Sequence, residues 1–167
     1  MVEKYCTLDN YAGTLDDDID VFHGSAYLNS INAIFAVATL ANINGIYIPV
    51  IILDDRFELD DGPLVVFGLY HELGHIILGH LDPFNNTKKE CWVTDDIYYD
   101  PEYEHQADLF AINKLIDSYG YECIKNNFLE IRSKFNAIMQ TEEDDGGFIF
   151  IDNVINRAII AINELAP

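Results

Sequence analysis

Residues 63–78 of this chain read PLVVFGLYHELGHIIL, and this stretch decides the fold. Pro63 suits the first position of a helix, and Asp60 and Asp61 just before it favour a helix N-terminus. Apolar side chains then follow on nearly every side, which is typical of a helix buried in the middle of a domain. Gly79 supplies a stop. The sequence therefore predicts a central buried helix over Pro63–Leu78.

This helix carries a His-Glu-x-x-His motif, His71-Glu72-Leu73-Gly74-His75. Histidines four residues apart lie on one helical face, about 5–6 Å between their Cβ atoms, so both imidazoles can meet one metal ion. Glu72 points elsewhere and is placed to act as the catalytic base. The motif predicts one Zn²⁺ held by His71 and His75. An ordinary helix, with both histidines satisfied by polar neighbours, is the alternative.

A catalytic zinc site takes three protein ligands, so a third must come from another part of the chain. The segment Glu104-His-Gln-Ala-Asp108 lies in a second expected helix, and its two carboxylates share one face. We expect Glu104 to bind the metal and Asp108 to accept the N–H of a ligand histidine, with His71 the best candidate. The alternative is that His105 replaces Glu104 as the third ligand.

Several other side chains are candidates for the site. His80 does not fit the metzincin pattern, which requires Gly at position 78 and His at position 81, where this chain has leucines. His80 is therefore expected at the helix end, outside the ligand set. Candidates for contacts with the substrate or the transition state are His80, Tyr98, Tyr99, Tyr103 and His105.

Composition limits the classes of function. The 167 residues, half of them hydrophobic, suit one domain with a sizeable core. The net charge of −20 argues against direct nucleic-acid binding and is compatible with a basic protein partner or with plain solubility. We find no signal-peptide pattern and no apolar run long enough to span a membrane, and therefore expect a cytoplasmic protein without membrane contact.

The pattern along the chain predicts an α+β fold, mostly helical, as a single zincin-like domain with a small sheet beside the motif helix. Residues 1–24 are expected to form a polar, acidic, peripheral leader, and residues 25–167 the metallopeptidase-like domain. Within that domain we expect five further features, listed here in chain order: a helix over Ala26–Ala41 ended by Asn44-Gly45, an edge strand or two short strand pieces over Ile46–Leu53 interrupted by Pro49, and helices over Pro101–Tyr119, Tyr121–Gln140 and Ile151–Leu165. The long Leu81–Tyr103 segment either covers the site or forms a hairpin that packs Trp92 into the core.

The run HELGHIILGH at residues 71–80, followed by EHQADLFA at residues 104–111, resembles the ImmA/IrrE family of bacterial and phage metallopeptidase-like proteins. The similarity covers about residues 46–116. It implies a zinc peptidase of the gluzincin type, with His71, His75 and Glu104 as ligands and Glu72 as catalytic base. The chain departs from the family in its leader and in its long segment before Glu104.

The resemblance also implies a class of substrate. Members of this family typically act in the cytoplasm on repressors with helix-turn-helix DNA-binding domains, releasing genes of phages, mobile elements or stress responses. A basic repressor of this kind is therefore the expected partner. Two alternatives stay open: an acidic binding protein that sequesters a basic regulator around a structural zinc, and Mn²⁺ or Fe²⁺ in place of Zn²⁺.

Overall fold

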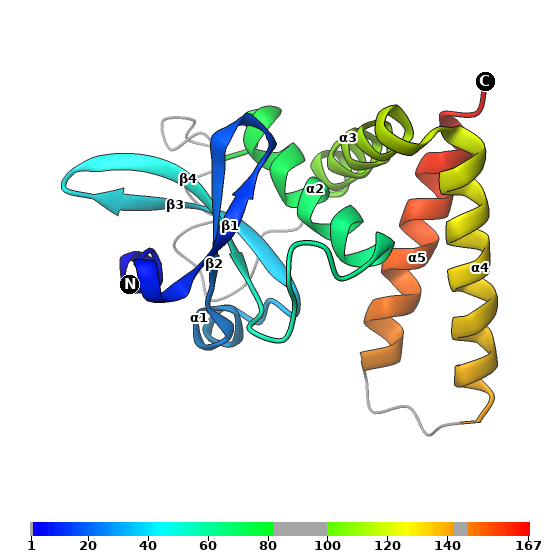
Figure 1. Cartoon of the computed structure of the whole chain (residues 1–167), viewed down its shortest axis with the longest axis horizontal. Helices are drawn as coiled ribbons and strands as arrows, with labels where there is room; N and C mark the ends of the chain where they lie inside the picture. Colours follow the sequence, from blue (N-terminus) through cyan, green and yellow to red (C-terminus); the bar gives the residue numbers. More distant parts are fainter. Residues whose placement is uncertain (1, 82–99, 142–146) are drawn as a thin grey trace.

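A computed structural model of the chain describes residues 2–81, 100–141 and 147–167. A β-sheet lies at one end of the molecule and a pair of long helices at the other, with two helices between them (Figure 1). The sheet has the order β1-β2-β4-β3 and consists of β1 (Tyr11–Leu15), β2 (Ile19–His23), β3 (Ala36–Ile43) and β4 (Ile46–Leu53). Only the pair β2 and β4 is parallel. Strand β3 therefore forms one edge of the sheet.

The first two strands correct the prediction of a peripheral leader over residues 1–24. The acidic run Asp16–Asp18 is the turn between β1 and β2, and Asp17 and Asp18 take positive φ angles of 61° and 58°. Aspartate tolerates this left-handed conformation better than most residues. Val21 of β2 is fully buried and pairs with Ile51 of β4. The acidic run thus marks a hairpin inside the sheet.

The predicted helix over Ala26–Ala41 is also wrong. Only Ser25–Ser30 is helical (α1), and the chain then enters β3. Asn44 and Gly45 have φ angles of 54° and 84° and join the paired residues at the ends of β3 and β4. Positive φ at both central residues is what a two-residue hairpin turn requires, and Asn-Gly is the commonest choice. This dipeptide is a hairpin turn and not a helix stop.

Strand β4 is not an edge strand, because it lies between β2 and β3. Its Pro49 is tolerated for a geometric reason. In an antiparallel pair, residues opposite each other alternate between hydrogen-bonded and non-hydrogen-bonded pairs. The bond from Asp54 N to Phe35 O makes Phe35 and Asp54 a hydrogen-bonded pair, so Pro49 and Leu40 form a non-hydrogen-bonded pair. On the other side, β2 pairs with β4 only over Ile51–Leu53. The missing N–H of Pro49 therefore interrupts neither pairing.

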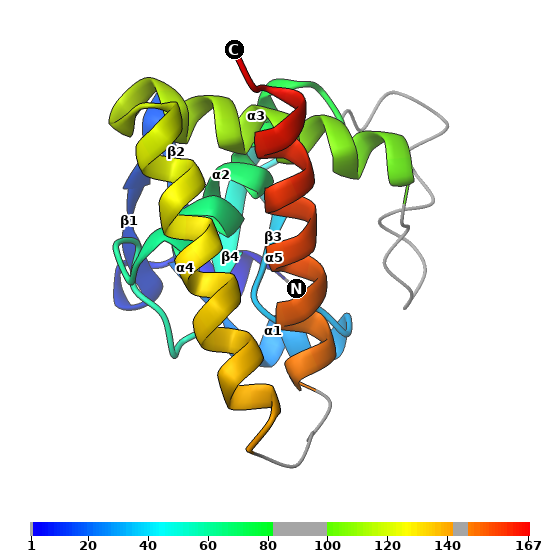
Figure 2. The ribbon, with the colours of Figure 1, turned by 90° about the vertical axis from the view of Figure 1, so that its right-hand side faces the viewer.

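The long helices agree well with the sequence. They are α2 (Pro63–Ile77), α3 (Pro101–Tyr119), α4 (Tyr121–Met139) and α5 (Gly147–Glu164), the last beginning four residues before its predicted start. Side chains from all four meet in one core, including Phe67, Ile112, Phe128 and Ile162. Figure 2 shows α4 and α5 side by side against α2 and α3.

The predicted fold class, a mixed α+β domain with a small sheet beside the motif helix, is confirmed. On its other face, α2 packs against the sheet through Val65, Leu69 and Leu73. Most of the Leu81–Tyr103 segment, including Trp92, lies outside the described residues. Among the described helices, none combines the length and the apolar character needed to cross a membrane.

Candidate metal centre

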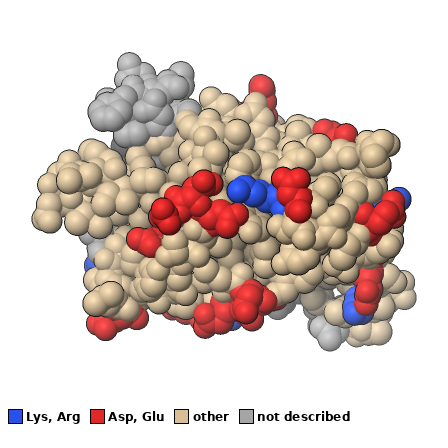
Figure 3. Space-filling view, turned by 45° about the horizontal axis from the view of Figure 1, so that its top comes forward, with Lys and Arg blue, Asp and Glu red and all other residues tan. Residues whose placement is uncertain are grey.

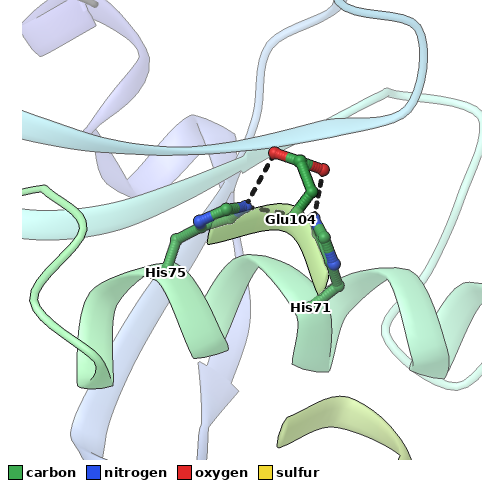
Figure 4. A group of neighbouring side chains, drawn as sticks. All are labelled: His71, His75 and Glu104. Carbon is green, nitrogen blue, oxygen red and sulfur yellow. Dashed lines mark hydrogen bonds and ion pairs between the residues drawn. The ribbon is translucent and has the colours of Figure 1, made fainter. Parts of the chain in front are cut away.

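The last two turns of α2 bring the motif histidines together. His71 and His75 project from the same face of the helix, and their Nε2 atoms are 3.1 Å apart (Figure 4). His71 is buried and His75 is half-buried. The buried helix predicted from the sequence therefore presents two imidazole nitrogens to one point.

Helix α3 supplies a carboxylate at the same point. Glu104 Oε2 lies 3.2 Å from His71 Nε2, and Oε1 lies 3.3 Å from His75 Nε2. One donor atom from each of the three residues lies within 4.8 Å of the others. Two imidazoles and one carboxylate are a donor set that divalent ions such as Zn²⁺ accept. These three residues could hold a metal ion, as the sequence predicted.

A close approach of α2 and α3 makes this arrangement possible. A Cβ atom at Gly74 would lie 3.2 Å from Cα and 3.3 Å from the carbonyl oxygen of Ala107 on α3. Contacts this short leave little room for any side chain at position 74. The glycine inside the motif therefore lets the two helices touch, which brings Glu104 within reach of both histidines.

Asp108 lies one turn after Glu104 and holds His71. Its Oδ1 is 2.8 Å from His71 Nδ1, and the Asp108 side chain is buried. A bond at Nδ1 leaves Nε2 of His71 for a metal ion, as carboxylates behind metal-binding histidines generally do. Burial opposes ionisation of Asp108, but hydrogen bonds from His71 and Arg157 outweigh it and hold the Asp108 pKa below its ordinary value. The geometry agrees with the role expected for Asp108.

The charges of the cluster shift two more pKa values. For His71, burial disfavours the charged imidazolium, yet hydrogen bonds to Asp108 and Glu104 outweigh it and raise the pKa from 6.5 to about 9. For Glu104, burial disfavours the carboxylate, but hydrogen bonds from His71 and His75 hold its pKa well below the ordinary value. Without metal, the cluster is therefore an ion pair around a protonated His71.

This ion pair predicts a pH dependence of stability in the metal-free protein. Because the pKa of His71 is raised from 6.5 to about 9, its contribution to stability is complete below pH 6.5 and is lost as the pH rises through 9. We expect the free energy of unfolding to fall by about 3 kcal/mol over this interval, measured by urea unfolding with a chelator present. The His71→Asn variant, which cannot titrate, should show a flatter profile. An equal fall in both proteins would contradict this assignment.

His75 is held by a different group of residues. Its Nδ1 lies 2.9 Å from Nδ1 of the buried His80, and His80 Nε2 lies 3.1 Å from Gln106 Oε1. Gln106 in turn donates to Glu102 Oε1 at 3.2 Å. If His75 binds a metal ion through Nε2, its Nδ1 carries a proton and donates to His80 Nδ1. His80 Nε2 then donates to Gln106, and Gln106 donates to Glu102, so each of these hydrogen bonds has one donor and one acceptor. Tyr103 stacks on the His80 ring with 4.2 Å between centroids. His80 thus lies behind a candidate ligand, outside the ligand group as predicted.

Replacing His80 by Phe tests whether the hydrogen bond to His80 orients His75. Phenylalanine keeps a ring that can stack on Tyr103 but removes the acceptor for His75 Nδ1. We expect Zn²⁺ affinity to fall about 10-fold or more, the lower part of the range for residues that orient a metal ligand. Competition with a chromophoric chelator measures the affinity. Unchanged affinity would mean that His80 does not orient His75.

Glu72 stands beside the donor group without belonging to it. Its Oε2 accepts a hydrogen bond of 2.7 Å from the backbone N–H of Ala38, on edge strand β3. In the register of β3 and β4, Ala38 and Ile51, like Leu40 and Pro49, form a non-hydrogen-bonded pair, so the Ala38 N–H points away from β4. The carboxylate is therefore held at β3, beyond which the described residues place no further strand.

The remaining predicted site residues divide into three outcomes. His105 bonds to Glu164 Oε2 at 3.0 Å on the exposed side of α3, so the alternative that it replaces Glu104 as ligand is wrong. Tyr103 stacks on the ring of His80. Tyr98 and Tyr99 lie outside the described residues.

Sequence reasoning missed Arg157, which lies in the middle of α5 and hydrogen-bonds to both Asp108 and Glu104. Its only signal in the sequence is that it is the single basic residue of a largely apolar final helix. It also missed the Ala38 amide, because β3 was expected to be helical.

Comparisons with protein-family models, with curated proteins and with solved structures found no match to this chain.

Proposed function

We propose that this chain is a zinc-dependent endopeptidase. The observation that carries the proposal is the position of Glu72. Its carboxylate is near enough to His71 for its negative charge to favour the imidazolium, it is not one of the three donors among the described residues, and it accepts a hydrogen bond from the Ala38 amide on edge strand β3. A structural metal site has no use for such a group, because it is usually closed by four ligands. A base beside an incomplete ligand set is what peptide hydrolysis requires.

The roles of the side chains follow from their contacts. When bound, a zinc ion lowers the pKa of a coordinated water toward about 7 and polarises a substrate carbonyl. Glu72 takes a proton from the attacking water and passes it to the leaving amine. Asp108 and His80 keep the two histidines oriented through their Nδ1 atoms. Glu104 completes the ligand set from α3.

The substrate we propose is an extended polypeptide paired with β3. Along this strand, alternate residues direct their backbone groups away from β4. The N–H of Ala38 already bonds to Glu72, and Leu40 is the next of these residues. No backbone hydrogen bond from Leu40 to another element occurs within residues 2–81, 100–141 and 147–167. An added strand could use such groups, as in other complexes that extend a sheet. The sequence predicts the sheet edge at Ile46–Leu53, whereas in the structure the edge is β3.

The proposed partner is a basic regulator, such as a helix-turn-helix repressor of a phage, mobile element or stress response. The net charge of −20 favours a basic protein over nucleic acid. On the face shown in Figure 3, acidic side chains form several groups and few basic ones are visible. A field of this sign attracts a DNA-binding domain before any specific contact forms.

The test is a cleavage assay on such repressors, beginning with one encoded beside this gene. The zinc-loaded protein should produce defined fragments by mass spectrometry, a chelator should stop the reaction, and added Zn²⁺ should restore it. Tight binding of the repressor by loaded and metal-free protein alike, with no fragment, would instead favour the acidic binding protein. That outcome would end the peptidase proposal for this substrate class.

A further inference from the structure

Arg157 connects α5 to the candidate metal centre. Its Nε donates to Asp108 Oδ2 at 2.8 Å, and its Nη2 donates to Asp108 Oδ1 at 2.8 Å. The same Nη2 lies 2.9 Å from Glu104 Oε2. One guanidinium therefore holds both the carboxylate expected to bind a metal and the carboxylate behind His71. The rigid fork of arginine suits this two-carboxylate contact, and lysine cannot reproduce it.

This contact leaves Glu104 able to bind a metal. Arg157 engages Oε2, whereas Oε1 faces His75 Nε2 at 3.3 Å. A carboxylate that ligates through one oxygen commonly has its other oxygen hydrogen-bonded, which fixes its orientation. Arg157 and a metal ion can thus hold the same carboxylate through different oxygens.

Two effects of the guanidinium oppose each other. Its positive charge repels a divalent cation, but that charge is already offset by the two carboxylates it contacts. Without Arg157, the buried Asp108 side chain would keep only His71 as a hydrogen-bonding partner among the described residues, and it would lie near the like charge of Glu104 on the same helical face. A buried carboxylate deprived of its cation reorients or takes up a proton. We expect the lost orientation to outweigh the relieved repulsion.

We propose that Arg157 is a positioning residue of the metal centre. It holds Glu104 ready to bind a metal and Asp108 ready to hold His71 before any ion arrives. The inference rests on the proposed metal site but not on peptidase activity.

The test compares Zn²⁺ affinity, by competition with a chelator, and the visible spectrum of bound Co²⁺. Arg157→Met should bind Zn²⁺ about 10–100-fold more weakly than the wild type and should change the Co²⁺ spectrum, and Arg157→Lys should be intermediate. The matched control is Arg132→Met. Arg132 joins α4 to α5 through Asp152 and Asn156, and among the described residues its hydrogen bonds go to these two and not to the site. This control should keep wild-type affinity even if its melting temperature falls.

Equal or tighter binding by Arg157→Met would overturn the inference, as would an equal loss in Arg132→Met, which would point to helix packing. If Arg157→Met does not fold, wild-type affinity and spectrum in Arg157→Lys would overturn it, because lysine lacks the fork. If the wild type itself binds no metal, the proposed function fails together with this inference. Weak binding confined to the Arg157 variants supports it.

Discussion

Replacing Glu72 by Gln is expected to lower peptidase activity by about 10²–10⁴-fold while leaving the metal content unchanged. Glutamine has nearly the same shape but cannot accept a proton. It can still accept the hydrogen bond of the Ala38 amide through its carbonyl oxygen, so the side chain should stay at the sheet edge. The loss should therefore fall on kcat, with little change in KM.

The measurement compares kcat, KM and bound zinc in the wild type and Glu72→Gln. Glu58→Gln serves as a control. Glu58 lies in the loop before α2, so this substitution removes one negative charge without altering the site. Equal cleavage by wild type and Glu72→Gln would contradict the role of Glu72 as base. Loss of zinc in Glu72→Gln would instead show that Glu72 is a ligand.

Glu104→Ala is expected to weaken Zn²⁺ binding by more than about 100-fold, a larger loss than for residues that only orient a ligand. The change removes one of three donors and leaves two histidines of the same helix. It also removes one of the two carboxylates that offset the charge of Arg157, so the guanidinium repels the ion more strongly. Both effects weaken Zn²⁺ binding.

His105→Ala is the matched control for Glu104→Ala. It is the next residue on α3, it is half-buried, and it bonds only to Glu164 among the contacts described above. Its Zn²⁺ affinity should stay within about twofold of the wild type, because its imidazole bonds to Glu164 and is not one of the three donors. Weak binding in His105→Ala together with normal binding in Glu104→Ala would mean that His105, and not Glu104, is the third ligand.

The candidate site was largely predictable because its signals are local. His71 and His75 are four residues apart on one strongly apolar helix, and Glu104 and Asp108 repeat that spacing on the next. Helix periodicity therefore fixes which side chains share a face before any tertiary contact is known. The distances among Glu104, Asp108 and the two histidines agree with that reasoning.

The strands were not predictable in the same way. The segment Ala36–Ala41 carries small apolar residues that fit a helix or a strand equally well, and its pairing with β4 decides between them. Asp16–Asp18 reads as a solvated run until the strands on either side are known to pair. The Asn44-Gly45 turn was a usable signal, since this dipeptide commonly joins two strands.

Arg157 and Ala38 show a second limit. Both reach the site only through tertiary packing, Arg157 from α5 and Ala38 from the sheet edge, and neither belongs to a motif with fixed spacing. A single arginine in an apolar helix indicates a buried or half-buried partner but not which one. Long-range contacts of this kind decide how Glu72 and Glu104 are oriented.

The most direct test is a Zn²⁺ titration of the metal-free protein, with X-ray absorption of the loaded form to count ligands. We predict one ion per chain, coordinated by two imidazole nitrogens and by oxygen, with binding lost in a His71→Ala, His75→Ala double variant. No binding by the wild type, or full binding by the double variant, would contradict a metal centre at His71, His75 and Glu104.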